Sequence, residues 1–147
     1  NSEFENHTLQ IISILTDRTK HSTEAIENLP IHIYSIGALL KSRYDTTQSE
    51  LITAFSQLSL EGRVAMALAI RDLTIGHNKN KAEFKISEIS KKTYSWNKKL
   101  HAFSFQQWQG FINDAFVKLE NNGLITKGAK GIRIIKREKF IIKPNQN

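Results

Sequence analysis

Basic side chains recur at close to three-residue spacing near the end of the chain, in the segment GLITKGAKGIRIIKREKF from Gly123 to Phe140. Ammonium and guanidinium groups pair with phosphate oxygens, so a hairpin formed by this segment could contact a DNA backbone without reading its bases. The candidates for such a DNA contact are Lys127, Lys130, Arg133, Lys136 and Arg137.

The same segment carries more apolar side chains than one face of a hairpin can use. Successive side chains of a strand point to opposite faces, so Ile132 would face one side while Ile135 would join Arg133 on the other. A two-stranded wing offers one face to its own core, and apolar side chains on both faces need a second cover. That cover could be N-terminal helices of the same chain or another molecule. The candidates for a dimer interface are Ile135, Phe140, Ile141 and Ile142.

Other residue types that commonly carry chemistry are missing or unsuitably spaced. The chain has no cysteine, which excludes disulfides and thiolate zinc sites. Its five histidines show neither an i, i+4 pair nor the H-E-x-x-H pattern, and the chain has no G-x-x-x-x-G-K-[ST] loop. We therefore predict a protein that is not an enzyme, with no catalytic residues, no cofactor and no metal.

Length and composition fit one domain better than two. The 147 residues are 39% hydrophobic and 24% charged, which is enough for one sizeable core. No run approaches the eighteen or more apolar residues that span a bilayer, so we expect no membrane partner. We divide the chain into a helical extension (residues 1–45), a core (46–143) and a polar tail (144–147).

Apolar residues at helical spacing predict helices throughout the first half of the chain. Three such patterns fall at residues 9–17, 22–30 and 31–45. Thr47 and Ser59 are placed to cap two further helices, which end near Leu58 and at Gly76.

The second half changes character after the polar run GHNKNK. A short alternating strand is predicted at residues 82–86, then a helix capped by Ser87, and then a longer helix over 105–121 that is closed by Asn122 and Gly123. The basic hairpin follows directly. This order predicts a mainly α fold with a small β-hairpin: a winged helix-turn-helix preceded by N-terminal helices, with residues 1–147 forming a single winged-helix domain.

The helix predicted at residues 105–121 is the one that would enter the major groove of DNA. Its apolar stripe includes Trp108, Phe111 and Phe116, which we interpret as core residues. Its outward positions carry one lysine and two acids among glutamines and asparagines. Amides can read adenine edges, but a face of net negative charge lacks the electrostatic attraction that supplies much of DNA affinity. Sequence-specific reading by this helix is therefore disfavoured.

Positive charge is concentrated in the second half. Residues 1–76 hold six basic and nine acidic side chains, a net charge of −3, whereas residues 77–147 hold fifteen and five, a net charge of +10. Such asymmetry indicates a polyanionic partner, either nucleic acid or an acidic protein surface. A solvated, lysine-rich surface that aids solubility would give the same count.

Two stretches carry a resemblance to a known family: QLSLEGRVAMALAIRDL at residues 57–73 and FSFQQWQGFINDAFVKLENNGLI at 103–125. Over roughly residues 33 to 136 the chain resembles the C-terminal winged-helix domain of the largest subunit of the origin recognition complex, and it looks closest to the silencing paralogue of that subunit. The resemblance implies an ATPase-like domain upstream and a nuclear, chromatin-bound setting. For the silencing paralogue it implies self-association within a repressor of heterochromatin, and for the origin subunit it implies DNA binding.

These observations predict a homodimerisation module of a heterochromatin silencing protein, which makes its parent bivalent on nucleosomes. Its partners would be a second copy of itself and, through the parent protein, chromatin or nucleosomes. The alternative is a DNA-binding winged helix that uses the basic wing. In a third interpretation the domain only packs against its own upstream ATPase-like domain.

Overall fold

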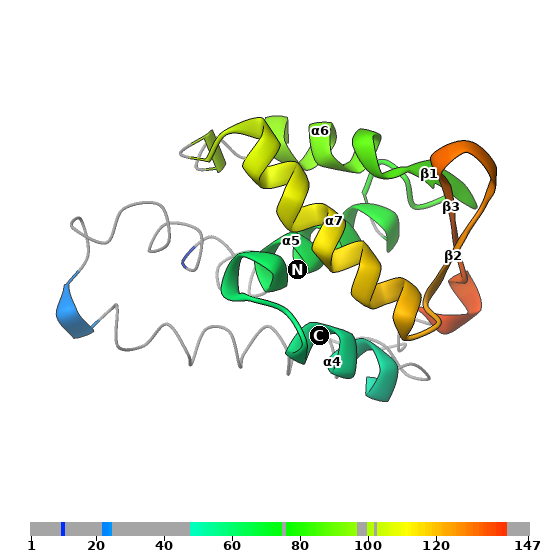
Figure 1. Cartoon of the computed structure of the whole chain (residues 1–147), viewed down its shortest axis with the longest axis horizontal. Helices are drawn as coiled ribbons and strands as arrows, with labels where there is room; N and C mark the ends of the chain where they lie inside the picture. Colours follow the sequence, from blue (N-terminus) through cyan, green and yellow to red (C-terminus); the bar gives the residue numbers. More distant parts are fainter. Residues whose placement is uncertain are drawn as a thin grey trace.

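The computed structural model describes residues 48–74, 76–96, 100–101 and 103–140, together with Gln10 and residues 22–24. This part of the chain is mainly helical, with one small antiparallel sheet (Figure 1). Its helices are α4 (Gln48–Ser56), α5 (Leu60–Thr74), α6 (Ile86–Trp96) and α7 (Phe105–Asn121). Its strands are β1 (Glu83–Lys85), β2 (Ile125–Lys127) and β3 (Ile132–Ile135), with short 3-10 turns at Ala129–Gly131 and Arg137–Lys139.

The central helix α5 begins where the sequence predicts a cap. The Ser59 hydroxyl accepts a hydrogen bond from the Gly62 N–H at 3.1 Å, which satisfies one of the free donors at the helix start. Beyond this cap the helix is rich in alanine and branched apolar residues, and ten of its fifteen residues are buried. The helix α5 is buried around much of its circumference, and it packs chiefly against α7 and less extensively against α6 and α4.

The helix α7 is capped at both ends; the sequence predicts the closure by Asn122 and Gly123, and the structure adds the cap at the start of the helix. At its start the Ser104 hydroxyl accepts from the Gln107 N–H at 3.1 Å, and the Gln107 side chain accepts from the Ser104 N–H at 2.8 Å, a reciprocal capping box. After its end Gly123 adopts a φ of 76°, a left-handed conformation that glycine adopts without steric cost. These caps set where α7 ends and where the chain turns into β2.

The inner side of α7 connects α6 and the sheet to the core. Trp108 is buried and its indole N–H donates to the Thr93 hydroxyl of α6 at 2.9 Å. Phe116 is also buried, and its ring centroid lies 5.4 Å from that of Phe84 on β1. Phe111 is partly buried against the same core. The interpretation of these three α7 aromatic residues as core is therefore confirmed.

The sheet has the strand order β1-β3-β2, and its register decides which side chains share a face. Phe84 lies opposite Arg133, and Ile125 lies opposite Ile135, so these side chains point to the inner face. The outer face carries Glu83, Lys85, Thr126, Ile132 and Ile134. The predicted alternation, with Ile132 on one face and Ile135 beside Arg133 on the other, is confirmed.

The arrangement is that of a winged helix-turn-helix, as the order of elements predicts. In Figure 1, α6 lies above and α4 below, while α7 crosses in front of α5 and leads into the sheet at the right. The helix α6 begins at Ile86, one residue before the predicted cap, because it follows directly from β1. The helices predicted at residues 9–17, 22–30 and 31–45, and the cap at Thr47, lie almost entirely outside the described residues.

Candidate interaction surfaces

Two of the four residues predicted for a dimer interface lie in the core of their own chain. Ile135 is 4% exposed and Phe140 is 6% exposed, and both belong to the main hydrophobic cluster. Ile141 and Ile142 lie outside the described residues. Ile135 and Phe140 are thus covered within the chain, which leaves them little surface for a partner, and the role of all four at an interface stays a prediction.

The apolar surplus that the sequence indicates is present on the outer face of the sheet. Ile132 and Ile134 are half-buried there, and their strand neighbours are Glu83, Lys85 and Thr126, which are exposed. Ile132 also leans against the wing turn, because a Cβ placed on Gly128 would meet its Cγ2 at 3.4 Å. The two isoleucines are neighbours on β3, and the charged side chains of β1 flank them, so the apolar area stays small.

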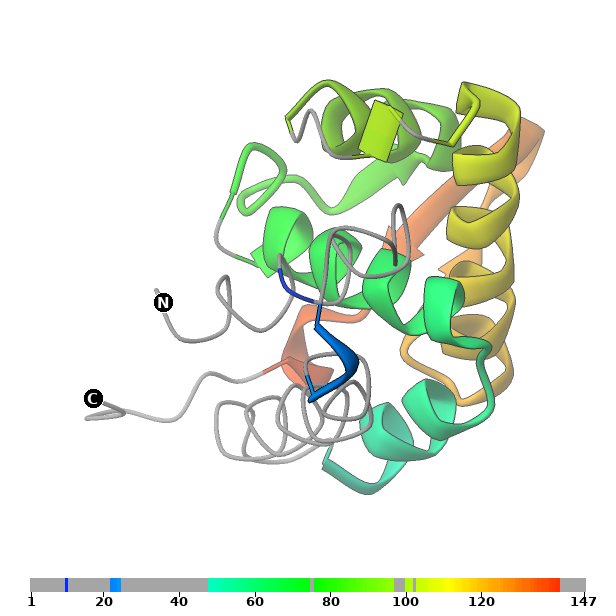
Figure 2. The ribbon, with the colours of Figure 1, turned by 90° about the vertical axis from the view of Figure 1, so that its left-hand side faces the viewer.

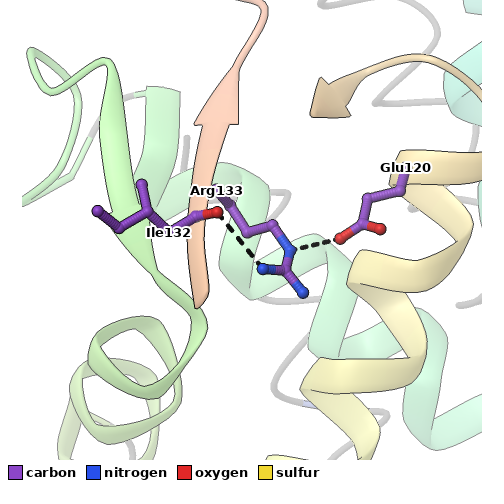
Figure 3. A network of polar contacts seen from close by, with 3 residues as sticks. All are labelled: Glu120, Ile132 and Arg133. Atoms are coloured by element: carbon purple, nitrogen blue, oxygen red, sulfur yellow. Dashed lines mark hydrogen bonds and ion pairs between the residues drawn. The ribbon is translucent and has the colours of Figure 1, made fainter. Parts of the chain in front are cut away.

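The wing arginine Arg133 is engaged with α7. Its Nε donates to the Glu120 carboxylate at 2.5 Å, and both side chains are mostly buried, at 16% and 17% exposure (Figure 3). A second contact joins Arg133 Nη1 to the Ile132 carbonyl at 3.4 Å. This ion pair fixes the wing to the C-terminal end of α7, and it uses the guanidinium that was a candidate for DNA contact.

The second wing arginine, Arg137, holds the loop between α5 and β1. Its Nη1 donates to the Leu73 carbonyl at 2.8 Å, and its Nη2 donates to the Asn78 carbonyl at 2.8 Å and to the Lys81 carbonyl. Burial lowers the pKa of the Arg137 guanidinium from its ordinary value, although an arginine stays charged at neutral pH. Arg137 therefore links three backbone carbonyls that are far from it in sequence.

The lysines of the wing differ from its arginines. Lys127 and Lys130 are exposed, and Lys136 is half-buried. Lys130 sits at the tip of the wing with a φ of 55°, a left-handed conformation that directs the turn between Gly128 and Gly131. Of the five candidates for DNA contact, Lys127 and Lys130 are thus the two that the fold presents most openly to solvent.

The outward face of α7 is nearly free of charge. Figures 1 and 2 both place this helix on the outside of the molecule, with α5 behind it in Figure 1 and to its left in Figure 2. Its exposed side chains form one strip along the helix: Gln106, Gln107, Asn113, Asp114, Val117 and Asn121, with Gly110 between them. Asp114 is the one charged residue of this strip, because Lys118 and Glu120 are half-buried and Glu120 holds Arg133.

Two residues of this strip were not singled out from the sequence. Val117 is 48% exposed, and it is the exposed large hydrophobic side chain of the described residues. Gly110 lies inside the helix, where glycine costs roughly 0.5–1 kcal/mol relative to alanine. Nothing lies within 4 Å of a Cβ built at that position, so no contact within the described residues requires a glycine. In the sequence, the features that could have identified these two residues are a valine on the polar face of the helix and a glycine in its middle.

A cleft of about 280 Å³ lies between the end of α5 and α6, lined by Arg71, Asp72, Gly76, His77, Lys92, Thr93 and Ser95. The Asp72 carboxylate accepts from the His77 N–H at 3.2 Å and from the Asn78 amide at 2.6 Å. Gly76 is closely packed there, since a Cβ would lie 3.0 Å from Asp72 Oδ1. Arg71 lies in the last turn of α5, where a cation is favoured by the helix C-terminus.

The described part of the chain has neither a metal-binding cluster nor a membrane-spanning helix. No group of three or more histidine, aspartate or glutamate side chains converges there. None of its helices is long and apolar enough to cross a bilayer.

The fold and the surfaces together define a winged-helix domain whose recognition-type helix presents an almost neutral strip and whose wing tip presents lysines. Comparison of the chain with models of known families, with curated proteins and with solved structures gives no match. The resemblance to the origin-recognition subunit family therefore stays a prediction.

Proposed function

We propose that this domain is a non-catalytic homodimerisation module, and that its parent is a nuclear heterochromatin silencing protein of the origin-recognition subunit family. The family and its setting rest on the resemblance of residues 57–73 and 103–125. The single observation that carries self-association is the outer strip of α7, which holds no basic side chain and exposes Val117.

The charge of the chain makes this strip the favoured place for two copies to meet. At a net charge of +7, copies repel one another wherever their lysines are juxtaposed. Exposed lysines lie on the loop before β1, on β1, on α6 and at the wing tip. The α7 strip offers amides and one exposed valine, so two such strips can approach without bringing cations together.

Dimerisation would act through avidity. Linking two weak nucleosome-binding units can raise their joint affinity roughly 10² to 10⁴-fold when both can bind at once. A bivalent parent protein could then bridge neighbouring nucleosomes, which is a physical route to a spreading, repressive chromatin state.

The test is the oligomeric state of the 147-residue chain by light scattering over a dilution series. A dimer is expected at micromolar concentration. Val117→Asp adds a negative charge beside Asp114 and removes the exposed apolar group, so it should weaken dimerisation by at least about tenfold, or 1.4 kcal/mol.

The matched control is Thr53→Asp, which introduces the same charge at an exposed position of α4. Its dimerisation should be that of the parent chain. A chain that stays monomeric at every accessible concentration would refute the proposed function.

A second candidate function, DNA binding by the wing, is favoured by the exposure of Lys127 and Lys130 at the wing tip. These ammonium groups are free to follow a phosphate backbone without sequence preference. Because the exposed strip of α7 offers no cation beside them, such binding would be weak and strongly dependent on salt.

A duplex titration at several salt concentrations tests this candidate. Lys127→Gln with Lys130→Gln should reduce the slope of log affinity against log salt by about two. The control removes the same charge from α6, through Lys91→Gln with Lys92→Gln. Equal losses in the two double variants would contradict a specific role of the wing.

A further inference from the structure

The position of Gly110 has no explanation within the described fold. It lies on the exposed strip of α7, its φ is not in the left-handed region, and a Cβ there would stand in open space. Glycine weakens a helix interior, so its presence at such a site points to a contact outside the chain. A glycine on a helix surface leaves a hollow into which a side chain of a neighbouring helix can fit.

Val117 supplies a side chain of the right kind on the same strip. It lies two helical turns from Gly110, on the same face of α7, with 48% of its surface exposed. Valine is short and branched, and its methyl groups would fill a hollow above a glycine without a change in rotamer.

Apart from Gln107, the strip is symmetric about a point between Asn113 and Asp114. Gly110 and Val117 lie three residues outside this pair on either side, and Gln106 and Asn121 lie seven residues outside it. Two such strips laid antiparallel would therefore bring each of the other six strip residues opposite its counterpart. A two-fold axis through the point between Asn113 and Asp114 generates this arrangement, which is the isologous form expected of a homodimer.

We infer that α7 packs antiparallel against α7 of a second copy, with Val117 of each chain seated over Gly110 of the other. The inference rests on the proposed homodimerisation and names its surface. Gly110 lets the two helices approach closely, and the two valine contacts form the apolar centre of the interface.

The polar residues of the strip fit the same arrangement. Asn113 of one copy lies opposite Asp114 of the other, so its amide donates to that carboxylate and separates the two like charges. Gln106 lies opposite Asn121, and each amide offers both a donor and an acceptor. Lysine is absent from the strip, which spares the contact from the repulsion that the +7 chains would otherwise bring.

A swap of the two central residues tests this geometry. Gly110→Val alone places two valines against each other, and Val117→Gly alone leaves a void, so each should weaken dimerisation by about tenfold or more. The double variant Gly110→Val with Val117→Gly keeps one valine facing one glycine in each contact, but the valine is now at position 110 and the glycine at position 117. It should restore dimerisation to within about threefold of the parent chain.

Cross-linking gives a second, independent measurement. Because the chain has no cysteine, Gly110→Cys with Val117→Cys introduces two unique thiols. Seven residues of helix separate them by about 10.5 Å within one chain, too far for an internal disulfide. Mild oxidation should therefore yield a covalent dimer. Val117→Cys alone is the control, since the two copies of residue 117 would lie about as far apart and should cross-link poorly.

The outcomes separate this inference from the function on which it rests. Helicity and thermal unfolding of every variant are followed by circular dichroism, so that a loss of dimer is not confused with a loss of fold. A parent chain that dimerises while the single variants dimerise equally well would refute the α7 interface and leave homodimerisation standing. A double variant that remains monomeric beside a dimeric parent would also refute it. A monomeric parent chain would overturn both.

Discussion

The wing and the outer strip of α7 lie next to each other and use their polar residues in opposite ways. The wing carries many charges, but its two arginines are turned inward, to Glu120 and to the carbonyls of the α5–β1 loop. The strip carries a single charge, and its residues make few contacts that the fold requires. The region that is richest in charge is therefore partly structural, while the strip of α7 keeps its side chains exposed at the surface.

This difference shows that the charge of a segment does not reveal which of its charged groups are available. Arginine presents several N–H donors in a fixed planar fork, which suits it to join carbonyls or a carboxylate inside a fold. Lysine is a strongly hydrated point charge on a flexible stem and stays at the surface. In this wing the arginines are half-buried, whereas Lys127 and Lys130 are exposed. Substitutions in the two regions should accordingly change different properties.

The largest expected effect comes from Arg137→Ala. It removes three hydrogen bonds from a charged donor and leaves the carbonyls of Leu73, Asn78 and Lys81 without that partner. We expect the free energy of unfolding to fall by about 3 kcal/mol. Urea unfolding followed by circular dichroism measures this change.

The control for Arg137→Ala is Lys127→Ala, which removes an exposed cation of the same wing. Its effect on unfolding should stay within about 0.5 kcal/mol. Similar losses of unfolding free energy in both variants would mean that Arg137 does not hold the loop. The half-buried arginines and the exposed lysines of the wing would then not differ in their contribution to stability.

The sequence predicts most of the local structure because local signals dictate it. Ser59 marks the start of α5, Asn122 and Gly123 mark the end of α7, and strand alternation places Ile132 and Ile135 on opposite faces. Each of these features depends on residues a few positions apart. The order of elements then limits the fold to a winged helix, which the structure confirms.

The sequence does not predict which polar side chains are engaged in contacts within the fold. Arg137 meets Leu73, which is 64 positions away, and Arg133 meets Glu120 across the turn from α7 to the wing. Such contacts depend on tertiary packing, which spacing does not encode. For the same reason, Ile135 and Phe140 could be named as apolar but could not be distinguished as core or interface from the pattern alone.

A smaller effect is expected from Glu120→Gln, which removes the charge that pairs with Arg133. Both side chains are mostly buried, so the loss should exceed that of a surface ion pair and reach about 1–2 kcal/mol in unfolding free energy. Asp114→Asn makes the same chemical change at an exposed position of the same helix. Measured by urea unfolding at low protein concentration, it should change stability by less than about 0.5 kcal/mol. An equal effect of the two would show that the wing is not held by this pair.

The smallest effect, and the one of opposite sign, is expected from Gly110→Ala. The methyl group enters open space, so the isolated domain should gain about 0.5–1 kcal/mol from the better helix propensity of alanine. The same methyl partly fills the hollow that Val117 of a second copy occupies, so the contribution of dimerisation to stability should shrink.

Thermal unfolding at several protein concentrations separates the effect on helix propensity from the effect on dimerisation, because dimerisation raises the melting temperature only where the dimer is populated. The variant should melt above the parent chain in dilute solution, and its advantage should decrease as the concentration rises. If the difference in melting temperature between the variant and the parent chain were the same at every concentration, Gly110 would not lie at an interface. The wing arginines would still be engaged within the fold, but the α7 strip would not be a contact surface.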